Sequence, residues 1–508
     1  MEPLAIRLHN NDNVVTAKSD IDPDILLNDE NITTKQFIPV GHKIATKDIS
    51  KGEDIIKYDN IIGTATDNIV IGDHVHVHNT GMSDKKRDYE FSQGCKELEI
   101  LPEDKQATFM GYKRPGGKYG TRNFVGIISS VNCSATVCKK IADTFNEEVM
   151  SQYPNVDGVV SITHSLGCGG NSRGMGWELL QATMQGYSRH PNFGGLLVIG
   201  LGCEVNQVAG MAQSMSWANS DTFKMMTIQE VGGSRKTINE GVEMIKQMLP
   251  ILNKNKREKC PASGLILGLE CGGSDAYSGM TANPALGAAV DLLVKNGGTG
   301  TLAETPEIFG AEHLLTRRAI TEEVGNKIVN FIKWWQEDYL AKHQPEQLHQ
   351  DPSPGNKAGG LTTILEKSLG AVAKGGTTNL VDVYQYAEPI KAKGFTFMNT
   401  PGYDPLSVTG MVAGGANIIC FTTGRGSVFG CKPSPSIKLA TNNDLYERMT
   451  EDMDINCGKI LMGESNIEEM GKEIFQYILD IASGQQSKSE INGVGDLEFI
   501  PWQMGAFN

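Results

Sequence analysis

The chain has 508 residues, of which 39% are hydrophobic and 21% charged, and its formal net charge is −14. This length suits two to four domains, and this composition excludes a disordered chain. The acidic balance argues against nucleic-acid binding, although a local group of cations can still bind an anionic substrate. No apolar run reaches the roughly 18 residues that span a bilayer, no signal-peptide pattern opens the chain, and the ten cysteines do not suggest a disulfide framework. We therefore expect a reduced, cytoplasmic protein that does not bind membranes.

Residues 1–84 predict a small all-β module, since short alternating runs are separated by Asn, Asp and Gly residues that favour turns. Near its end, His74, His76 and His78 alternate with valines. Because strand side chains alternate between faces, the three imidazoles would share one face of a strand, and imidazole suits Fe, Zn or Mn. We take them as candidate metal ligands; an exposed polar strand face is the alternative.

Residues 85–110 show no sustained period, so we expect a linker that is long enough to let the module dock at a distance. From residue 111 the pattern changes to strands that alternate with helices. This alternation predicts Rossmann-like α/β domains built on parallel sheets. We place one domain at 111–255 and another at 260–508, and whether the latter is one domain or two stays open.

Four cysteines each follow a short apolar run of the kind that forms a buried strand. Cys133, Cys168 and Cys203 are evenly spaced along the chain, which suits successive strand–helix units, and Cys271 repeats the pattern in the next domain. Ligands of open α/β sheets bind beyond the carboxyl ends of the strands. These thiols are therefore candidates for a soft metal site or a thiol-lined pocket, and small core residues are the alternative.

Two further groups of residues suggest a site for an acid. The segment Glu270–Asp275 follows a strand, its two glycines allow a ligand to approach closely, and Ser274 adds a hydroxyl; an ordinary loop with a helix cap is the alternative. Asn356 and Lys357 lie in a Pro- and Gly-rich loop without the P-loop spacing, and Arg425 follows another expected strand. Cations on such loops can bind a carboxylate, and hydroxyl and amide groups can add hydrogen bonds. We therefore expect the substrate to be bound by Ser274, Asn356, Lys357 and Arg425.

Taken in order, these stretches resemble the altronate/galactarate dehydratase family over nearly the whole chain. The motifs that carry the resemblance are His74–Thr80, Gly200–Glu204, Glu270–Asp275, Thr281–Pro284, Pro352–Lys357 and Thr423–Gly426. The resemblance implies an N-terminal SAF-type module and a hydro-lyase that converts a sugar acid to a 2-keto-3-deoxy acid. It also implies a divalent metal, usually Fe(II), with Mn(II) as an alternative.

Two features favour the altronate branch of this family, namely the His-rich strand and the segment Glu304–Glu312. They imply conversion of D-altronate to 2-dehydro-3-deoxy-D-gluconate and water in hexuronate catabolism. In contrast, Ser165–Gly176 and Asn132–Cys133 depart from the altronate pattern in loops where a substrate would bind. Galactarate or another aldonate is therefore the alternative substrate.

Dehydration of a 2,3-dihydroxy acid needs a base for the C2 proton, an acid for the departing 3-hydroxyl, and a Lewis acid that stabilises the enediolate. We expect His164, at a strand end, to fill one of the two proton-transfer roles and Asp275 or Glu304 to fill the other.

The metal has two competing forms. In the first, the histidines of the β module and strand-end residues such as Cys271 bind one Fe(II) ion. In the second, Cys133, Cys168 and Cys203 hold an iron–sulfur cluster with an open iron.

Other classes of protein stay open at this point. SAF-type modules also occur in binding proteins, so a sugar-acid-binding protein without turnover is the non-enzyme alternative. A sulfo-lyase acting on 3-sulfolactate is a rival enzyme, although its two parts are usually separate chains. As partners we expect the small-molecule sugar acid and a second copy of the chain in a homodimer.

Overall fold

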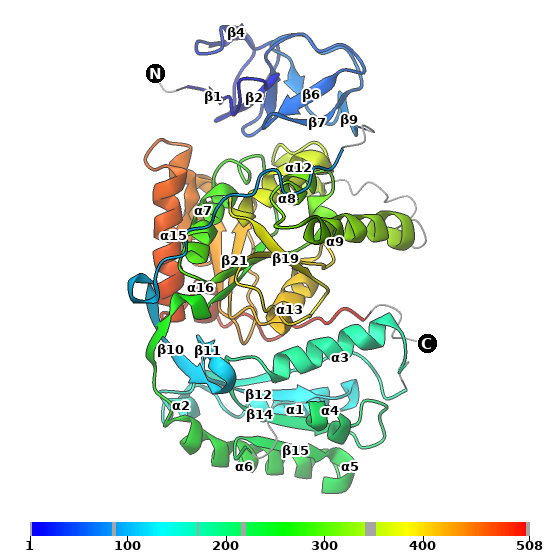
Figure 1. Cartoon of the computed structure of the whole chain (residues 1–508), viewed down its shortest axis with the longest axis vertical. Helices are drawn as coiled ribbons and strands as arrows, with labels where there is room; N and C mark the ends of the chain where they lie inside the picture. The colour runs from blue at the N-terminus through cyan, green and yellow to red at the C-terminus, as the bar shows by residue number, and fades with distance from the viewer. Residues whose placement is uncertain (1–2, 84–87, 170–171, 215–219, 341–351, 504–508) are drawn as a thin grey trace.

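Two kinds of sheet follow one another along the molecule (Figure 1). The computed structural model describes residues 3–83, 88–169, 172–214, 220–340 and 352–503. In these ranges, the antiparallel sheets of a small β module precede two parallel α/β sheets, which confirms the predicted fold class. The β module lies at one end of the molecule, a four-stranded parallel sheet lies at the other, and a seven-stranded parallel sheet lies between them. No helix in the described ranges is long and apolar enough to cross a membrane.

The β module has short strands because Asp, Asn and Gly repeatedly interrupt its apolar runs. Its largest sheet has the order β1-β2-β5-β8, and Val15, Ile38 and Ile44 are buried in its core. The strands of the module are β1 (Ala5–Ile6), β2 (Val14–Ala17), β3 (Leu26–Leu27), β4 (Ile32–Thr33), β5 (Lys43–Ala45), β6 (Asp54–Lys57), β7 (Asn60–Ala65), β8 (His74–Val75) and β9 (Thr80–Gly81).

The histidine-bearing strand is shorter than the sequence predicts. β8 ends at Val75, whereas the alternating pattern predicts a strand that continues to His78. Asn79 ends it, because its side-chain oxygen accepts from the backbone N–H of His76 at 2.9 Å and its amide donates to the carbonyl of His74 at 2.9 Å. The chain therefore turns, and His78 is exposed in that turn.

The second region forms a four-stranded parallel sheet with the order β13-β12-β14-β15. The chain leaves β12 for β13 on one side and then adds β14 on the other, so the strand order reverses between β12 and β14. The strands are β12 (Phe124–Ser129), β13 (Gly158–Ile162), β14 (Phe193–Gly200) and β15 (Phe223–Thr227). The helices are α1 (Asn132–Ala142), α2 (Glu147–Met150), α3 (Met175–Ser188), α4 (Val208–Ser214), α5 (Ile228–Val231) and α6 (Ser234–Leu252).

The third region is organised around one seven-stranded parallel sheet with the order β19-β20-β18-β17-β21-β22-β23. Helices α7 and α15 pack together over one face, where Leu267 and Ile418 are buried, while α13 covers the other face, where Ile419 and Phe421 are buried. The strands are β17 (Ile266–Cys271), β18 (Thr299–Leu302), β19 (Leu380–Tyr384), β20 (Gly394–Met398), β21 (Ile418–Thr423), β22 (Ser436–Ala440) and β23 (Ile455–Asn456). The helices are α7 (Ala282–Lys295), α8 (His313–Thr316), α9 (Glu322–Lys333), α11 (Pro354–Ala358), α12 (Ile364–Val372), α13 (Asp404–Gly414), α14 (Asn443–Arg448), α15 (Ile467–Ala482) and α16 (Lys488–Ile491).

The segment 88–107 lies along the third region. The backbone N–H of Gly94 donates to the carbonyl of Arg317 at 2.7 Å, and Leu98 packs against the core. Residues 84–87, which belong to the expected linker, lie outside the described ranges. The segment leads into a small antiparallel sheet formed by β10 (Thr108–Arg114), β11 (Lys118–Gly120) and β16 (Glu258–Pro261).

Three buried charged side chains join the β module to the third region. Glu366 of α12 accepts from Lys43 at 2.9 Å and from Lys57 at 2.9 Å, and the three side chains are at most 1% exposed. Burial alone would raise the pKa of Glu366, but the two lysines hold it well below its usual range. Both lysines find their carboxylate partner across the interface, while Glu366 also accepts from the backbone N–H and the hydroxyl of Thr362 in its own region. The ion triad therefore holds the module against the third region.

Replacing Lys57 by Met should lower the free energy of unfolding by about 1.5–3 kcal/mol, because Glu366 loses one charge-assisted hydrogen bond and keeps the one from Lys43. Lys51 is a matched control, since it is exposed and its Nζ lies 3.9 Å from an exposed carboxylate oxygen of Asp67. Lys51→Met should leave the unfolding midpoint in urea nearly unchanged. Equal midpoints for the two variants would contradict the role assigned to the triad.

Candidate active site

The carboxyl ends of the seven parallel strands carry many of the polar groups that the sequence singles out. The strand order reverses between β17 and β21, and α/β sheets leave a ligand-binding crevice at such a point. The loop after β17 contains Ser274 and Asp275, and the loop after β21 contains Arg425. These loops are in contact, because the backbone N–H of Arg425 donates to the carbonyl of Gly273 at 2.8 Å.

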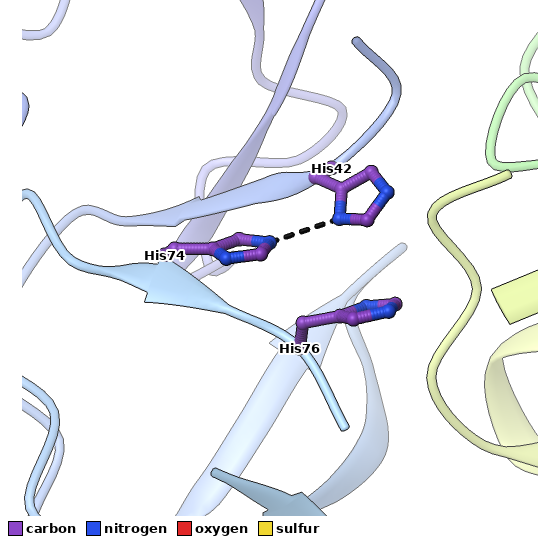
Figure 2. A group of neighbouring side chains, drawn as sticks. All are labelled: His42, His74 and His76. Atoms are coloured by element: carbon purple, nitrogen blue, oxygen red, sulfur yellow. Dashed lines mark hydrogen bonds between the residues drawn. The ribbon is translucent and has the colours of Figure 1, made fainter. Parts of the chain in front are cut away.

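The β module brings three histidines to the boundary with this region (Figure 2). Ligand nitrogens of His42, His74 and His76 all lie within 4.8 Å of one another. Strands β5 and β8 pair so that Ile44 lies opposite His74, and the same register continued by two residues brings His42 opposite His76. The Nε2 atom of His42 lies 3.4 Å from the carbonyl oxygen of Ala358 in α11, so the histidine group faces the third region.

The surroundings of these histidines suit metal ligation. Burial lowers the pKa of His74 and of His76 to about 3 and lowers the pKa of His42, so the rings are neutral and keep a free lone pair. His42 Nδ1 and His74 Nε2 lie 2.9 Å apart, while the buried Nδ1 of His76 has no hydrogen-bond partner in the described part of the chain. A buried nitrogen without a partner is costly, and a bound cation would remove that cost.

A second group of side chains lies at the same strand ends, and all of its members except Lys367 and Asp404 are buried. We call it the acid–lysine group, and its members are Glu270, Cys271, Glu304, Glu307, Lys367, Lys374 and Asp404. Oxygens of Glu270, Glu304 and Asp404 lie within 4.8 Å of one another, which is close enough for a shared proton or a shared cation. Lys367 donates to Glu307, and Lys374 Nζ lies 3.8 Å from Glu304 Oε2. The lysines therefore offset part of the negative charge.

Within this group, Glu270 and Glu304 form a pair of carboxyl groups whose ionisation is disfavoured. Burial raises the pKa of Glu270 to about 8, and burial together with the charges of Glu270 and Glu307 raises the pKa of Glu304 well above its ordinary value. Two carboxyl groups this close do not both ionise easily. The hydroxyl of Ser407 donates to Glu270 Oε2 at 2.7 Å, whereas the buried Oε1 of Glu304 has no hydrogen-bond partner among the described residues. Glu304 thus presents an unused oxygen.

Glu304 is also unusual in its backbone. Its φ of 66° lies in the left-handed region, which residues other than glycine rarely adopt. The hydroxyl of Thr400 accepts from its backbone N–H at 2.8 Å, which helps to hold this conformation. Strained residues of this kind gather at functional sites, because the surrounding structure must hold them in place.

Two residues that the sequence predicts as site residues are occupied by contacts within the chain. Asp275 accepts two hydrogen bonds on each oxygen, from the segments 277–278 and 441–442. The amide of Asn356 donates to the carbonyl of Ser274 at 2.8 Å, and its oxygen accepts at the start of α11. Both side chains therefore shape the strand edge and have little capacity left for a substrate.

Lys357 and Arg425 lie nearer the surface of the same edge. Lys357 is half-buried in α11, next to the residue whose carbonyl faces His42, and Arg425 is exposed. Both are more exposed than Ser274 and Asn356, the other two predicted substrate-binding residues, which are buried. The loop 165–176, where the sequence departs from the altronate pattern, belongs to the four-stranded sheet, and its residues 170–171 lie outside the described ranges.

His164 and three of the predicted cysteine ligands lie on the four-stranded sheet. His164 follows β13 and is buried, and burial lowers its pKa to about 4, so the ring is neutral. Cys133, Cys168 and Cys203 follow β12, β13 and β14. The structure therefore does not bring His164 to the edge that carries Glu304, and of the four predicted strand-end cysteines only Cys271 lies there.

Five residues of the site escape prediction from the sequence, namely His42, Glu307, Lys367, Lys374 and Asp404. His42 stands alone between a glycine and a lysine, and only the register of β5 against β8 reveals that it joins the other histidines. Glu270 lies within a motif that the sequence does single out. The two lysines and Asp404 come from segments that carry no recognisable signal.

A doubly wound α/β sheet with closely spaced buried carboxyl groups at its strand ends, and neutral histidines of the β module at its boundary, suits an enzyme that moves protons on a small anionic substrate. Three family descriptions match the chain. They are the altronate/galactarate dehydratase SAF domain at residues 3–83, the second domain of D-galactarate dehydratase/altronate hydrolase at 111–253, and the C-terminal part of D-galactarate/altronate dehydratase at 262–507.

Relatives of the chain agree with these matches. Altronate dehydratase of Bacillus subtilis (strain 168) is 38% identical over 97% of each chain, and altronate dehydratase of Escherichia coli (strain K12) is 35% identical over 97% of this chain and 98% of its own. Galactarate dehydratase (L-threo-forming) of Escherichia coli (strain K12) is 36% identical over 95% of this chain and 93% of its own. The chain therefore belongs to the altronate/galactarate dehydratase family, as its motifs predict. It is a hydro-lyase of that family, a sugar-acid dehydratase with an N-terminal SAF domain.

Proposed function

We propose that this dehydratase converts D-altronate to 2-dehydro-3-deoxy-D-gluconate and water with the help of a divalent metal, Fe(II) or alternatively Mn(II). The observation that carries the proposal is the group of His42, His74 and His76, set against the strand edge that also holds Lys357 and Arg425. Two of the relatives described above are altronate dehydratases, which supports altronate over galactarate.

The three histidines fit a divalent metal, because their nitrogens converge, are neutral and include one buried atom without a partner. A metal held there supplies Lewis-acid stabilisation for the charge that develops on the carboxylate and 2-hydroxyl oxygens of a hydroxy acid. The β module touches the acid–lysine group through α12, since Glu366 binds its lysines and the next residue, Lys367, donates to Glu307.

The acid–lysine group is suited to the two proton transfers. Dehydration breaks the C2–H and C3–O bonds, and the resulting enol becomes the 2-keto acid when its proton moves to C3. The unused oxygen of Glu304 is placed to accept the C2 proton, and a protonated carboxyl group of the pair with Glu270 can protonate the departing 3-hydroxyl, which leaves as water. The two roles need opposite protonation states, and a pair that retains a proton provides both. The sequence suggests His164 for one proton-transfer role and Asp275 or Glu304 for the other. We assign Glu304 to the role of the base and a carboxyl group of its pair with Glu270 to the role of the acid.

Turnover of a panel of acids tests the substrate. D-altronate, galactarate and other aldonates are each incubated anaerobically with the protein, Fe(II) and a reductant, and the 2-keto-3-deoxy product is measured. D-altronate should give the highest kcat/KM. A far higher value for galactarate would overturn the substrate assignment, and binding of altronate without any product would overturn the proposed reaction.

Lys357→Met and Arg425→Met should each lower kcat/KM by about ten- to a hundredfold, mainly through a higher KM. Each cation is expected to pair with the substrate carboxylate, and a charge-assisted hydrogen bond is worth about 1.5–3 kcal/mol. Lys139, exposed on α1 of the second region, is a matched control whose change to Met should leave KM unaltered. If Lys357→Met instead lowers the melting temperature and keeps KM, the residue only closes the turn at α11.

A further inference from the structure

Three exposed thiols lie at the carboxyl edge of the four-stranded sheet, away from the histidine site. Cys133 is in the first turn of α1 after β12, Cys168 is in the loop after β13, and Cys203 is in the loop after β14. These strands are neighbours, and the strand order reverses between β12 and β14, so this edge has a crevice position of its own. The three cysteines are exposed and form no disulfide, whereas six of the other seven cysteines are buried, and the sulfur of Cys203 accepts from the side-chain amide of Gln229 at 3.4 Å.

Backbone hydrogen bonds tie the three cysteine-bearing loops to one another. The backbone N–H of Asn132, next to Cys133, donates to the carbonyl of Leu166 at 2.8 Å, two residues before Cys168. The N–H of Val205 donates to the carbonyl of Cys168 itself at 3.1 Å. The cysteines therefore approach one shared location from three loops and do not lie scattered over the surface.

Two buried polar side chains, Glu204 and Asn206, form hydrogen bonds that fix these loops. Glu204 is 3% exposed, and its oxygens accept from the hydroxyl of Ser130 at 2.5 Å and from the backbone N–H groups of Leu201 and Gly202 at 3.2 and 2.6 Å. The amide of Asn206 donates to the carbonyl of Ser130 at 3.1 Å. Burying a carboxylate is costly, and here the bonds that compensate for it fix the turn immediately before Cys203.

The three sulfurs are not gathered around a position for a single metal ion. Thiolates around one tetrahedral ion, each about 2.3 Å from it, lie roughly 3.8 Å apart. Among the described residues, the three sulfurs do not form a group within 4.8 Å, although the histidines do. In a cluster of several irons each cysteine binds a different iron, so the sulfurs lie farther apart. The N-terminus of α1, beside Cys133, favours the negative charge of such a cluster.

We propose that Cys133, Cys168 and Cys203 bind an iron–sulfur cluster of which one iron carries no cysteine. This site lies on a different sheet from the histidines, at the end of the molecule opposite the β module (Figure 1). Together with the metal proposed at the histidines, this would give the chain two metal sites, so the two forms of metal binding that compete in the sequence need not exclude each other. The proposal goes beyond the dehydration reaction and does not depend on altronate as the substrate.

The full chain, purified anaerobically and reconstituted with ferrous iron and sulfide, provides the test. Acid-labile sulfide should be retained after desalting together with at least an equal amount of iron, and the sample should show a broad visible absorption that bleaches on reduction. Cys133→Ser, Cys168→Ser and Cys203→Ser should each reduce retained sulfide at least tenfold. Cys95→Ser is the matched control, because Cys95 is also exposed and free but donates to the carbonyl of Ala319 in the third region. No retained sulfide in the wild type, or wild-type sulfide in the three variants, overturns the proposal.

Two further measurements separate this proposal from other outcomes. Alkylation of the wild-type chain followed by peptide mass spectrometry should show the three cysteines protected only after reconstitution and Cys95 labelled in both states, which does not depend on how the variants fold. His76→Ala should retain as much acid-labile sulfide as the wild type. It should lose only the iron in excess of that sulfide, which is the iron proposed at the histidines. If His76→Ala loses the sulfide as well, the cluster is not held by the cysteines alone and the proposal of an independent site is wrong.

Discussion

Glu304→Gln is expected to lower kcat by about a hundred- to ten-thousandfold, which is the usual contribution of a positioned acid–base group. Gln has the same shape as Glu but cannot accept the C2 proton, so KM should change much less than kcat. The variant should be at least as stable as the wild type. Burial and the charges of Glu270 and Glu307 disfavour the ionised form of Glu304, and the neutral amide of Gln avoids that cost. Steady-state kinetics on D-altronate and a thermal melt of the same sample measure both quantities.

Glu312 provides the matched control for this variant. It is also buried, it lies on the same segment, and it accepts from the hydroxyl of Tyr89 at 2.8 Å, outside the acid–lysine group. Glu312→Gln should retain a kcat close to that of the wild type. If the two variants lose activity equally, or if Glu304→Gln unfolds, the proton-transfer role of Glu304 is not supported.

His76→Ala is expected to lower kcat about a hundredfold or more and to weaken metal binding, since a bound metal is worth several kcal/mol of transition-state stabilisation. The fold should persist, because His76 is only half-buried and makes no side-chain hydrogen bond through Nδ1. Titration with Mn(II) followed by calorimetry measures the affinity, and turnover with Fe(II) measures the rate.

His78→Ala is the control for His76→Ala. It removes an imidazole of the same short segment, and this imidazole lies outside the group formed by His42, His74 and His76. It should bind Mn(II) and turn over nearly as the wild type does. Wild-type metal affinity in His76→Ala, or an equal loss in His78→Ala, would show that the histidine group is not the metal site.

Much of the fold is predictable from the sequence, because alternation of strand and helix and continuous apolar runs are local patterns. The strand ends that carry Cys133, Cys203 and Cys271 follow from such runs, and the order of the motifs suffices to indicate the family. The extent of the histidine strand is mispredicted, because the side chain of Asn79 competes with the ladder for backbone groups, and alternation alone cannot show this competition.

The composition of the site is less predictable, because it depends on contacts between segments that are far apart in the chain. His42 and Ala358 meet only when the β module docks, and Lys374 reaches Glu304 only when α12 lies over the strand ends. A residue such as Asp275 looks like a catalytic acid in the sequence and is a hydrogen-bonded support in the structure. Chemical type suggests candidates, but the number of partners that each side chain already has decides which of them are available.

The ion triad between the β module and the third region determines how ligands can reach the histidines. Separating the two bodies would deprive Lys43 and Lys57 of their carboxylate partner and leave Glu366 with no cation, which disfavours opening of the module during the catalytic cycle. The β module therefore holds the histidines in a fixed position relative to the third region and does not act as a lid. We therefore expect exchange of the substrate and product to depend on local motion of the loops that carry Lys357 and Arg425, and not on movement of a domain.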